Sequence, residues 1–455
     1  MKLKSPWTPR LAETEGSVSD RLAAALSDDI ADGHIAAGAR LPAHRSLAYQ
    51  LGIGIGTVTK AYSALERRGL VRGAHGRGMF VAGLVPKPAA IVDLSINVPP
   101  TALTDRLLAS TLQSLAKEID AQAFSTYQPV SGTLDDRRAL AAWLSHPAHA
   151  FDAEDMLVTH GAQHALAVAF SLARRSGATM ITESVTYPGA LALARQIGLN
   201  VMGVQIDDDG LDPKALRAVL ARVRGDAFVY TTPTLHNPSG RTQGTRRRQD
   251  IARLCRDHDV LIVEDEIYAP LLPSRLRPIA SFAPERTLHV AGLSKVLCPG
   301  LRVGVLVVPP RLRLDAQTAL EASATMSSPL SGAIARRWLA DGTADDLLAS
   351  VRHEARRRQE LATRVLGLPV EKRNGFHLFI PLDEKKADSV RIAALECGVV
   401  LTPSTAMTVD SKTAVSGLRI CLGGPTMTAL DDALQRVQNL LDRDQTTVTV
   451  PRRSL

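Results

Sequence analysis

The N-terminal part of the chain alternates amphipathic stretches with polar breaks. Residues 17–32 repeat apolar side chains at helical spacing, which predicts a helix with one buried face. A shorter helix is expected from about residue 43 to residue 50. A third apolar stripe at i, i+4 and i+7, formed by Val58, Tyr62 and Leu65, predicts another helix. The pattern is typical of a small domain in which each helix buries one face.

The third helix follows the sequence LGIGIG and is expected to start near Thr57 and to end at Gly69. The glycine spacing fits neither a P-loop nor a dinucleotide fingerprint, and the segment before it is helical rather than a strand. Residues 70–83 show two short apolar pieces around a basic, glycine-rich turn, which predicts a hairpin. Three helices followed by a hairpin indicate a winged helix-turn-helix domain over residues 14–83.

A different pattern follows residues 84–92, which contain two prolines and are interpreted as a short, stiff linker. Through residues 130–330, helical segments alternate with the short apolar runs MLV, ATMIT, AFVYT, VLIVED, TLHVAG and RVGVLVV. This alternation predicts a mostly parallel sheet covered by helices on both faces. Residues 331–440 hold longer helices and a few strands, typical of a smaller α+β domain. Residues 93–440 thus form one α/β body, and residues 441–455 a poorly ordered tail.

The composition agrees with a globular protein of two domains, and the distribution of charge indicates the kind of partner that the N-terminal domain binds. With 45% hydrophobic and 22% charged residues, the chain is typical of globular proteins, and no apolar run is long enough to predict a membrane span. We expect no signal peptide, disulfide framework or metal site, because the N-terminus lacks an apolar segment and the four cysteines lie far apart; a reducing cytoplasm fits. Residues 1–83 hold 11 Lys and Arg against 7 Asp and Glu, half of the net charge of +8, which favours an anionic partner.

Polar residues follow the predicted strands of the body, where ligands of α/β sheets bind. Asn237 follows AFVYT, Asp265 and Tyr268 follow VLIV, and Lys295 and Arg302 follow TLHVAG. This set suits pyridoxal phosphate. The aldehyde of that cofactor needs a lysine amine, its ring nitrogen a carboxylate, and its phosphate an arginine and helix N-terminal amides. Asn and Tyr supply neutral donors for the ring hydroxyl.

The predicted winged domain carries side chains that suit contacts to DNA phosphates and base edges. They lie off the apolar stripe of the third helix, at the start of the second helix and around the hairpin. The candidates are Arg45, Ser46, Thr57, Thr59, Lys60, Arg72, His75 and Arg77. Double-stranded DNA is therefore an expected partner.

The stretch LPAHRSLAYQLGIGIGTVTKAYSALERRGLVRGAHGRGMFV resembles the winged-helix domain of GntR-type bacterial regulators. That family shares a Leu-Pro-Ser-x-Arg-x-Leu-Ala helix, a Thr-Val-x-x-Ala-Tyr recognition helix and a Gly-x-Gly-x-Phe-Val wing. The resemblance covers nearly all of residues 17–83. The family usually has Ser and Arg where this chain has Gly54 and Ile55, and there the Ser caps the recognition helix and the Arg contacts DNA. We therefore expect a cap weaker by a few tenths to about 1 kcal/mol, and a different DNA affinity and operator sequence.

The body, over about residues 93–440, resembles fold type I pyridoxal phosphate enzymes of the aspartate aminotransferase class. HNPSG, DEIY and SKVLCPGLRVG are similar to their Asn-Pro-x-Gly, Asp-x-x-Tyr and Ser-Lys…Arg-x-Gly motifs. The resemblance implies that Lys295 is the catalytic residue, which forms the internal aldimine and moves the proton. It also implies that Asp265 pairs with the ring nitrogen, and that Asn237 and Tyr268 hold the ring hydroxyl.

The same resemblance implies roles for further residues. The cofactor phosphate would be held by Ala162, Gln163, Ser294 and Arg302. Tyr187 would stack on the cofactor, Tyr127 would reach the phosphate of the neighbouring subunit in a homodimer, and Arg419 would hold an effector or substrate carboxylate. Gly292 stands where the family often has a Ser, three residues before the lysine, so one phosphate donor is expected to be missing.

A GntR-type head followed by an aminotransferase-like body is similar to the MocR subfamily of regulators, over almost the whole chain. The resemblance implies a homodimeric transcription regulator that binds DNA and senses pyridoxal phosphate, or an amine or amino-acid effector, by Schiff-base exchange at Lys295. An active aminotransferase with an accessory DNA-binding head is the alternative, because sensor and enzyme need the same residues around the cofactor. A dimerisation scaffold without cofactor is disfavoured by the intact Lys, Asp and Arg set.

Overall fold

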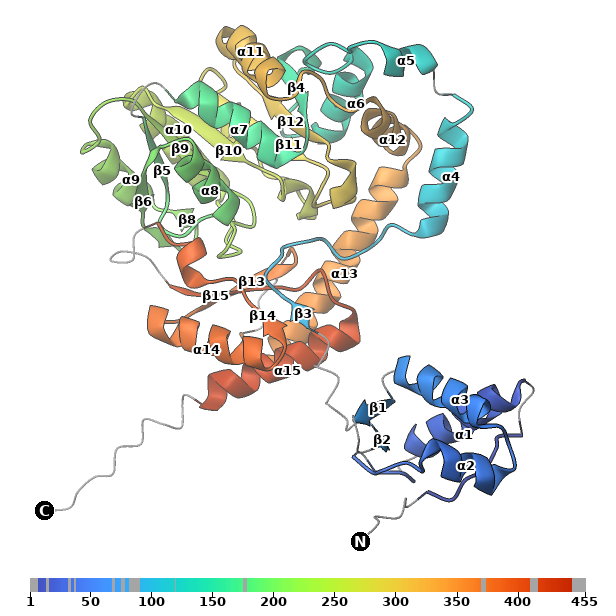
Figure 1. The fold of residues 1–455 in the computed structure, drawn as a ribbon. Coiled ribbons are helices and arrows are strands. Elements are labelled where there is room, and N and C mark those ends of the chain that lie inside the picture. Colours follow the sequence, from blue (N-terminus) through green and yellow to red (C-terminus); the bar gives the residue numbers. More distant parts are fainter. Residues whose placement is uncertain are drawn as a thin grey trace, which may run out of the picture. The chain divides into compact units, whose positions relative to one another are not determined.

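The computed structural model describes residues 7–13, 16–31, 34–36, 38–67, 70–74, 78–81, 91–118, 120–174, 178–369, 374–409 and 416–443. The chain divides into two compact units, Met1–Ala90 and Ile91–Leu455, here called the head and the body. Each unit is described by itself. Figure 1 shows the small helical head and the larger body, which contains the sheet.

Within its described residues, the head consists of three helices and a hairpin. They are α1 (Val18–Ala31), α2 (His44–Leu51), α3 (Ile55–Arg67), β1 (Val71–Ala74) and β2 (Gly78–Val81). The apolar stripes of the helices meet in one core that includes Leu22, Leu47, Val58 and Tyr62, and the hairpin adds Val71. β1 and β2 pair antiparallel. The predicted winged helix-turn-helix fold is confirmed.

The glycine-rich turn leads directly into α3, which begins at Ile55 rather than near Thr57. The Thr57 amide donates to Gly54 O at 3.0 Å, so Gly54 supplies the first carbonyl of the helix but no capping side chain. A Cβ placed on Gly54 would have only Thr57 Oγ1 within 4 Å, at 3.7 Å. The turn therefore has space for the serine that GntR-type regulators usually carry here.

The body is built around a seven-stranded sheet of order β4-β12-β11-β10-β9-β5-β6, counted over the described residues. The strands are β4 (Met156–Thr159), β5 (Thr179–Glu183), β6 (Asn200–Val204), β9 (Ala227–Thr231), β10 (Leu261–Asp265), β11 (Thr287–Gly292) and β12 (Gly304–Val307). Neighbours pair in parallel, except that β12 runs antiparallel to both β4 and β11. The predicted mostly parallel sheet is confirmed, and β6 is a strand that the apolar pattern did not predict.

Helices cover both faces of this sheet (Figure 1). Adjacent residues of β5 alternate between the two layers: Met180 packs with α7 and α8, whereas Ile181 packs with α9 and α10. The helices of the large part are α6 (Leu134–Leu144), α7 (Ala162–Ala173), α8 (Pro188–Gln196), α9 (Pro213–Leu220), α10 (Thr245–Asp257), α11 (Arg313–Ala324) and α12 (Pro329–Ala340). Shorter or peripheral elements are α4 (Asp105–Leu115), α5 (Ala121–Ser125), β7 (Ile206–Asp207) and β8 (Gly210–Leu211).

A smaller α+β part has its own apolar core. It contains α13 (Thr343–Val365), β13 (His377–Pro381), α14 (Glu384–Glu396), β14 (Val399–Val400), β15 (Gly417–Cys421) and α15 (Met427–Arg443). The first strand of the body, β3 (Val92–Asp93), pairs with β14 and so ties the start of the body to this part. Among the described helices, none combines the length and apolar character needed to cross a membrane.

Candidate functional site

A cavity of about 390 Å³ lies at the carboxyl ends of β9, β10 and β11. Ten residues predicted from the sequence line it: Ala162, Gln163, Tyr187, Asn237, Asp265, Tyr268, Ser294, Lys295, Arg302 and Arg419. Tyr127 is not part of the lining, and 84% of its surface is exposed. The cavity is closed on one side by residues 95–98, which follow β3. Residues that follow the strands and residues 95–98 therefore line the same cavity.

Lys295 lies just beyond β11, and its side chain reaches residues 95–98. Its Nζ donates a hydrogen bond to the Asn97 carbonyl oxygen. Burial lowers the pKa of the Lys295 amine to about 8. A substantial fraction of the amine is therefore neutral at mildly alkaline pH, the form required for attack on a carbonyl carbon.

Asp265 ends β10 and is buried beneath the cavity. Its Oδ2 accepts a hydrogen bond from Tyr230 Oη at 3.0 Å. Burial raises the pKa of Asp265 to about 6, against the effect of that hydrogen bond. A cationic group in the cavity would favour the ionised carboxylate and gain a buried ion pair.

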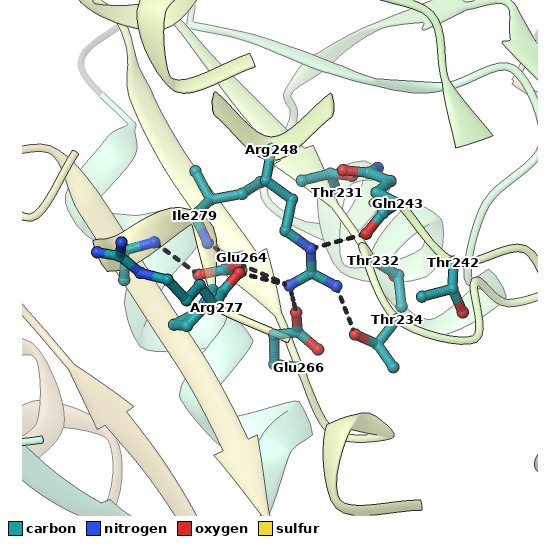
Figure 2. A network of polar contacts seen from close by, with 12 residues as sticks. Thr231, Thr232, Thr234, Thr242, Gln243, Arg248, Glu264, Glu266, Arg277 and Ile279 are labelled. Carbon is teal, nitrogen blue, oxygen red and sulfur yellow. Dashed lines mark hydrogen bonds and ion pairs between the residues drawn. The ribbon is translucent and has the colours of Figure 1, made fainter. Parts of the chain in front are cut away.

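A buried polar network surrounds the end of β10, where Asp265 lies. Arg248 of α10 is fully buried and forms an ion pair with Glu266, while Glu264 lies 3.9 Å away (Figure 2). Arg248 also donates to Thr234 Oγ1 at 2.8 Å. Burial raises the pKa of Glu266, and the Arg248 charge opposes that rise. One arginine thus compensates the acidic residues on both sides of Asp265.

An anion-binding edge is formed where α7 begins. Gly161 precedes α7 with φ 82°, and a Cβ there would lie 2.6 Å from Arg302 Nη2. Arg302 Nη1 donates to Ser294 Oγ at 3.3 Å, and its Nη2 donates to His160 O at 3.1 Å. The absence of a side chain on Gly161 lets the guanidinium approach the free amides of the helix N-terminus. Together these groups suit a phosphate.

Arg419 lies on β15 and is buried at the opposite side of the cavity. Its Nη1 donates to Asn237 Oδ1 at 2.9 Å, which leaves the Asn237 amide hydrogens for the cavity. Its Nη2 donates to Ser95 O at 2.6 Å and to Thr402 Oγ1 at 2.9 Å. The Ser95 carbonyl therefore occupies a donor that a ligand carboxylate could use.

An aromatic wall is provided by Tyr187, which precedes α8. A Cβ on Gly189 would lie 2.4 Å from Tyr187 Cζ, so only glycine permits this ring position. Gln163 Nε2 donates to Gly189 O at 3.0 Å and links α7 to this turn. The Tyr187 side chain lines the cavity and gives it an aromatic surface.

Comparison with known proteins connects this geometry to two families. Residues 89–437 match aminotransferase class I and II, and residues 18–81 match the gntR family of bacterial regulatory proteins. The chain belongs to the aminotransferase class I and II family. Its head is a GntR domain, so the predicted fusion of a GntR-type head with an aminotransferase-like body is confirmed, in agreement with the MocR arrangement.

Relatives that match most of the chain are named as transcriptional regulators. YdeF of Bacillus subtilis (strain 168) is 26% identical over 452 residues, covering 96% of this chain and 97% of that protein. TauR of Rhodobacter capsulatus is 29% identical over 412 residues, covering 80% and 83%. Both are named HTH-type transcriptional regulators. The GntR–aminotransferase chain thus resembles regulators along both of its parts.

Solved structures share the fold of the aminotransferase body. An archaeal alanine:glyoxylate aminotransferase has a TM-score of 0.72 at 21% identity, covering 85% of this chain and 95% of that one. LysN, an α-aminoadipate aminotransferase from Thermus thermophilus, has a TM-score of 0.70 at 21% identity, covering 85% and 100%. It was solved in complex with N-(5'-phosphopyridoxyl)-L-leucine. At this identity the likeness shows the fold alone.

The GntR domain presents several of the predicted DNA-binding residues. Arg45 and Ser46 are exposed on α2, and Thr59 and Lys60 are exposed on α3, whereas Thr57 is half-buried. Arg72 lies on β1, with its side chain outside the described part. His75 and Arg77 lie outside the described residues.

Sequence reasoning missed three residues of the site. Tyr230, which contacts Asp265, is hidden in an apolar strand and resembles an ordinary core aromatic. Ser95 and Asn97 come from the segment before the sheet, far from any predicted strand end. An amide in the otherwise apolar run INVPP was the available signal for Asn97, but no local pattern connects it to Lys295.

Proposed function

We propose that this aminotransferase-family protein is a DNA-binding transcriptional regulator of the cytoplasm whose body binds pyridoxal 5'-phosphate and senses an amine or amino acid by Schiff-base exchange at Lys295. The convergence of Lys295, Asp265 and the anion-binding edge on one cavity carries the proposal. The GntR domain and the regulator relatives support the regulatory role.

The donor set of the cavity fits the cofactor. Arg302 matches a phosphate group, and it can lie against the start of α7 because Gly161 has no Cβ to displace the guanidinium. Asp265 matches a protonated ring nitrogen, and Asn237 and Tyr268 match a ring oxygen. Tyr187 supplies the stacking face. Each part of pyridoxal phosphate thus finds a partner of suitable charge.

The protein's own residues define the chemistry that such a site permits. When bound, the cofactor supplies an aldehyde and an electron-withdrawing ring. Lys295 would meet that aldehyde as the neutral amine, which its lowered pKa makes available. Asp265 would be ionised by an opposing charge in the cavity and would keep the ring nitrogen protonated. A Lys295 amine released by an effector amine would be the group placed to move a proton.

Effector recognition would involve Arg419. In the described structure its Nη2 is taken by Ser95 O, so an effector carboxylate would have to replace this carbonyl. Residues 95–98 come shortly after the linker from the GntR domain, with β3 between them. Displacement of this segment is a route by which binding in the cavity could alter the head.

Tyr127 is the residue that would connect the two subunits of a homodimer in this proposal. It is 84% exposed and lies outside the lining of the cavity in its own chain. In the homodimer we propose, Tyr127 reaches the phosphate of the neighbouring subunit.

The alternative is an active aminotransferase with an accessory head. The cavity is equally compatible with it, because the same Lys, Asp and Arg residues would serve both roles. Mixing the purified protein with pyridoxal phosphate, an amino acid and a 2-oxo acid measures turnover, and a gel shift with the upstream region measures DNA binding. Specific DNA binding with negligible turnover supports the regulator, whereas rapid turnover without DNA binding supports the enzyme.

Gly161→Ala is expected to weaken pyridoxal phosphate binding about tenfold or more. The new Cβ displaces Arg302, whose charged hydrogen bonds are worth about 1.5–3 kcal/mol each. Absorbance titration gives the apparent Kd. Gly198→Ala is the matched control, because Gly198 has a similar φ of 71° but no atom within 4 Å of its Cβ. Equal affinities of both variants and the wild type for pyridoxal phosphate would show that the anion-binding edge does not hold the phosphate.

Lys60→Ala is expected to weaken DNA binding to a similar extent on all sequences. The exposed amine on α3 would neutralise one phosphate, so the slope of log K against log salt should fall in magnitude by about 0.9. Fluorescence anisotropy at several salt concentrations measures this slope. Lys385→Ala on α14, also exposed, is the control and should leave it unchanged. An unaltered slope for Lys60→Ala would remove this residue from the DNA interface.

A further inference from the structure

Asn97 connects the cavity to a buried histidine. Its Nδ2 donates to Tyr268 Oη at 2.8 Å and lies 3.1 Å from His377 Nδ1. All three side chains are buried, with 7%, 3% and 3% of their surfaces exposed. His377 Nε2 lies 3.2 Å from the His236 carbonyl oxygen. The chain of contacts therefore runs from a backbone carbonyl to the phenol of Tyr268.

The carbonyl at the end of this chain fixes the direction of every hydrogen bond in it. The His236 oxygen can only accept, so His377 Nε2 must carry the hydrogen. Burial lowers the pKa of His377 to about 3, so the ring is neutral and its Nδ1 is an acceptor. The Asn97 atom facing Nδ1 must then be its amide nitrogen. The second hydrogen of this nitrogen goes to Tyr268 Oη.

These hydrogen bonds leave the phenolic hydrogen of Tyr268 available to the cavity. Its oxygen already accepts from Asn97, and within the described residues Tyr268 Oη has no other hydrogen-bond partner. Tyr268 lines the cavity, so its own hydrogen is directed there. Asn237, whose Oδ1 is held by Arg419, presents its amide hydrogens to the same cavity. The site thus offers two neutral donors and suits a negatively charged ring oxygen.

We propose that Asn97 is a positioning residue that, held by His377, makes Tyr268 an obligate hydrogen-bond donor to the ring oxygen of the bound cofactor. This inference rests on the proposed function. Asn97 also holds Lys295 through its backbone carbonyl, so one residue orients the amine and the phenol. Its side-chain Oδ1 is buried without a partner among the described residues, so the amide is held through its nitrogen.

Asn97→Asp reverses the hydrogen-bond direction with little change in shape. A carboxylate oxygen at the position of Nδ2 can only accept, so it takes the Tyr268 hydrogen and favours a protonated His377. Tyr268 then presents lone pairs to the cofactor instead of a hydrogen. With Lys295 joined to the cofactor aldehyde, a donor to the ring oxygen would favour loss of the proton from the Lys295 nitrogen. Loss of that donor should therefore raise the pH at which the proton leaves.

The experiment is a pH titration of the visible absorption band of the full-length protein loaded with pyridoxal phosphate. We expect the midpoint of Asn97→Asp to lie about one pH unit or more above that of the wild type. Tyr268→Phe should shift it in the same direction. Asn200→Asp, at an exposed site on β6, is the control and should leave it unchanged. The ionisable groups around Lys295 and Tyr268 are kept in Asn97→Asp: Asp265, Tyr187, Arg302, Arg419 and Cys421.

The outcomes separate the two proposals. A wild type that remains colourless with pyridoxal phosphate overturns the proposed function and this inference with it. A coloured wild type with the same midpoint in Asn97→Asp overturns the role of Asn97 alone. Asn97→Ala is titrated beside Asn97→Asp, because the new carboxylate by itself would hold the proton on the Lys295 nitrogen, whereas alanine removes the donor without adding charge. A smaller upward shift for Asn97→Ala supports the proposal, and an unchanged midpoint contradicts it.

Discussion

Lys295→Ala is expected to fold normally and to lose the covalent cofactor band completely. The alanine side chain has no amine, and within the described residues Lys295 is the only lysine that lines the cavity. Bound cofactor should then wash out on dialysis, because only noncovalent contacts, among them those of Arg302, Asp265 and Tyr187, remain. Absorbance spectra before and after dialysis measure both effects. Circular dichroism checks that the fold is intact.

The attachment point can also be located directly. Borohydride reduction of the wild-type complex, followed by peptide mass analysis, should place the cofactor on the peptide that contains Lys295. Lys385→Ala, which changes an exposed lysine of the same body, should behave as the wild type. A covalent band that persists in Lys295→Ala, or a label on another lysine, would contradict the assignment.

Arg248→Met is expected to lower the free energy of unfolding of the body by about 3–5 kcal/mol, because it leaves buried carboxylates without a counter-charge. Figure 2 shows the guanidinium between Glu264 and Glu266, with further hydrogen bonds to Thr234 Oγ1 and Gln243 O. The side chain of Arg248 is fully buried, so solvent does not replace these contacts. Urea unfolding followed by circular dichroism measures the change.

The same helix offers a matched control for this prediction. Arg253 of α10 pairs with Asp250 at 2.7 Å, but 63% of its side chain is exposed. Arg253→Met should therefore change the free energy of unfolding by less than about 1 kcal/mol. If Arg248→Met costs no more than Arg253→Met, the buried network does not stabilise the strand that carries Asp265.

Much of the fold could be predicted because the apolar pattern is local and strong. The alternation of short buried strands and helices defined the sheet, and the rule that ligands bind at strand ends located Lys295 and Asp265. β6 was missed because Asn200 and Gly203 interrupt its apolar pattern at the sheet edge. The pairing of β3 with β14 joins segments about 300 residues apart, which no local pattern encodes.

The parts of the site that escaped prediction depend on contacts distant in sequence. Asn97 lies 171 positions from Tyr268 and 280 from His377, and only the folded chain brings them together. Tyr230 matches the apolar pattern of β9, so its hydrogen bond to Asp265 becomes visible only when β9 and β10 are paired. Family resemblance carried over the residues of known motifs, whereas Asn97 and Tyr230 lay outside those motifs.

DNA binding by the GntR domain is expected to respond to the state of the cavity around Lys295. Fluorescence anisotropy of a labelled fragment from the protein's own upstream region tests it most directly, with full-length protein at fixed salt. We predict that pyridoxal phosphate, alone or with an effector amine, changes the Kd of the wild type at least about fivefold, but not that of Lys295→Ala. Tight DNA binding with the same Kd in every cofactor state, in a wild type that is fully loaded, would contradict the account.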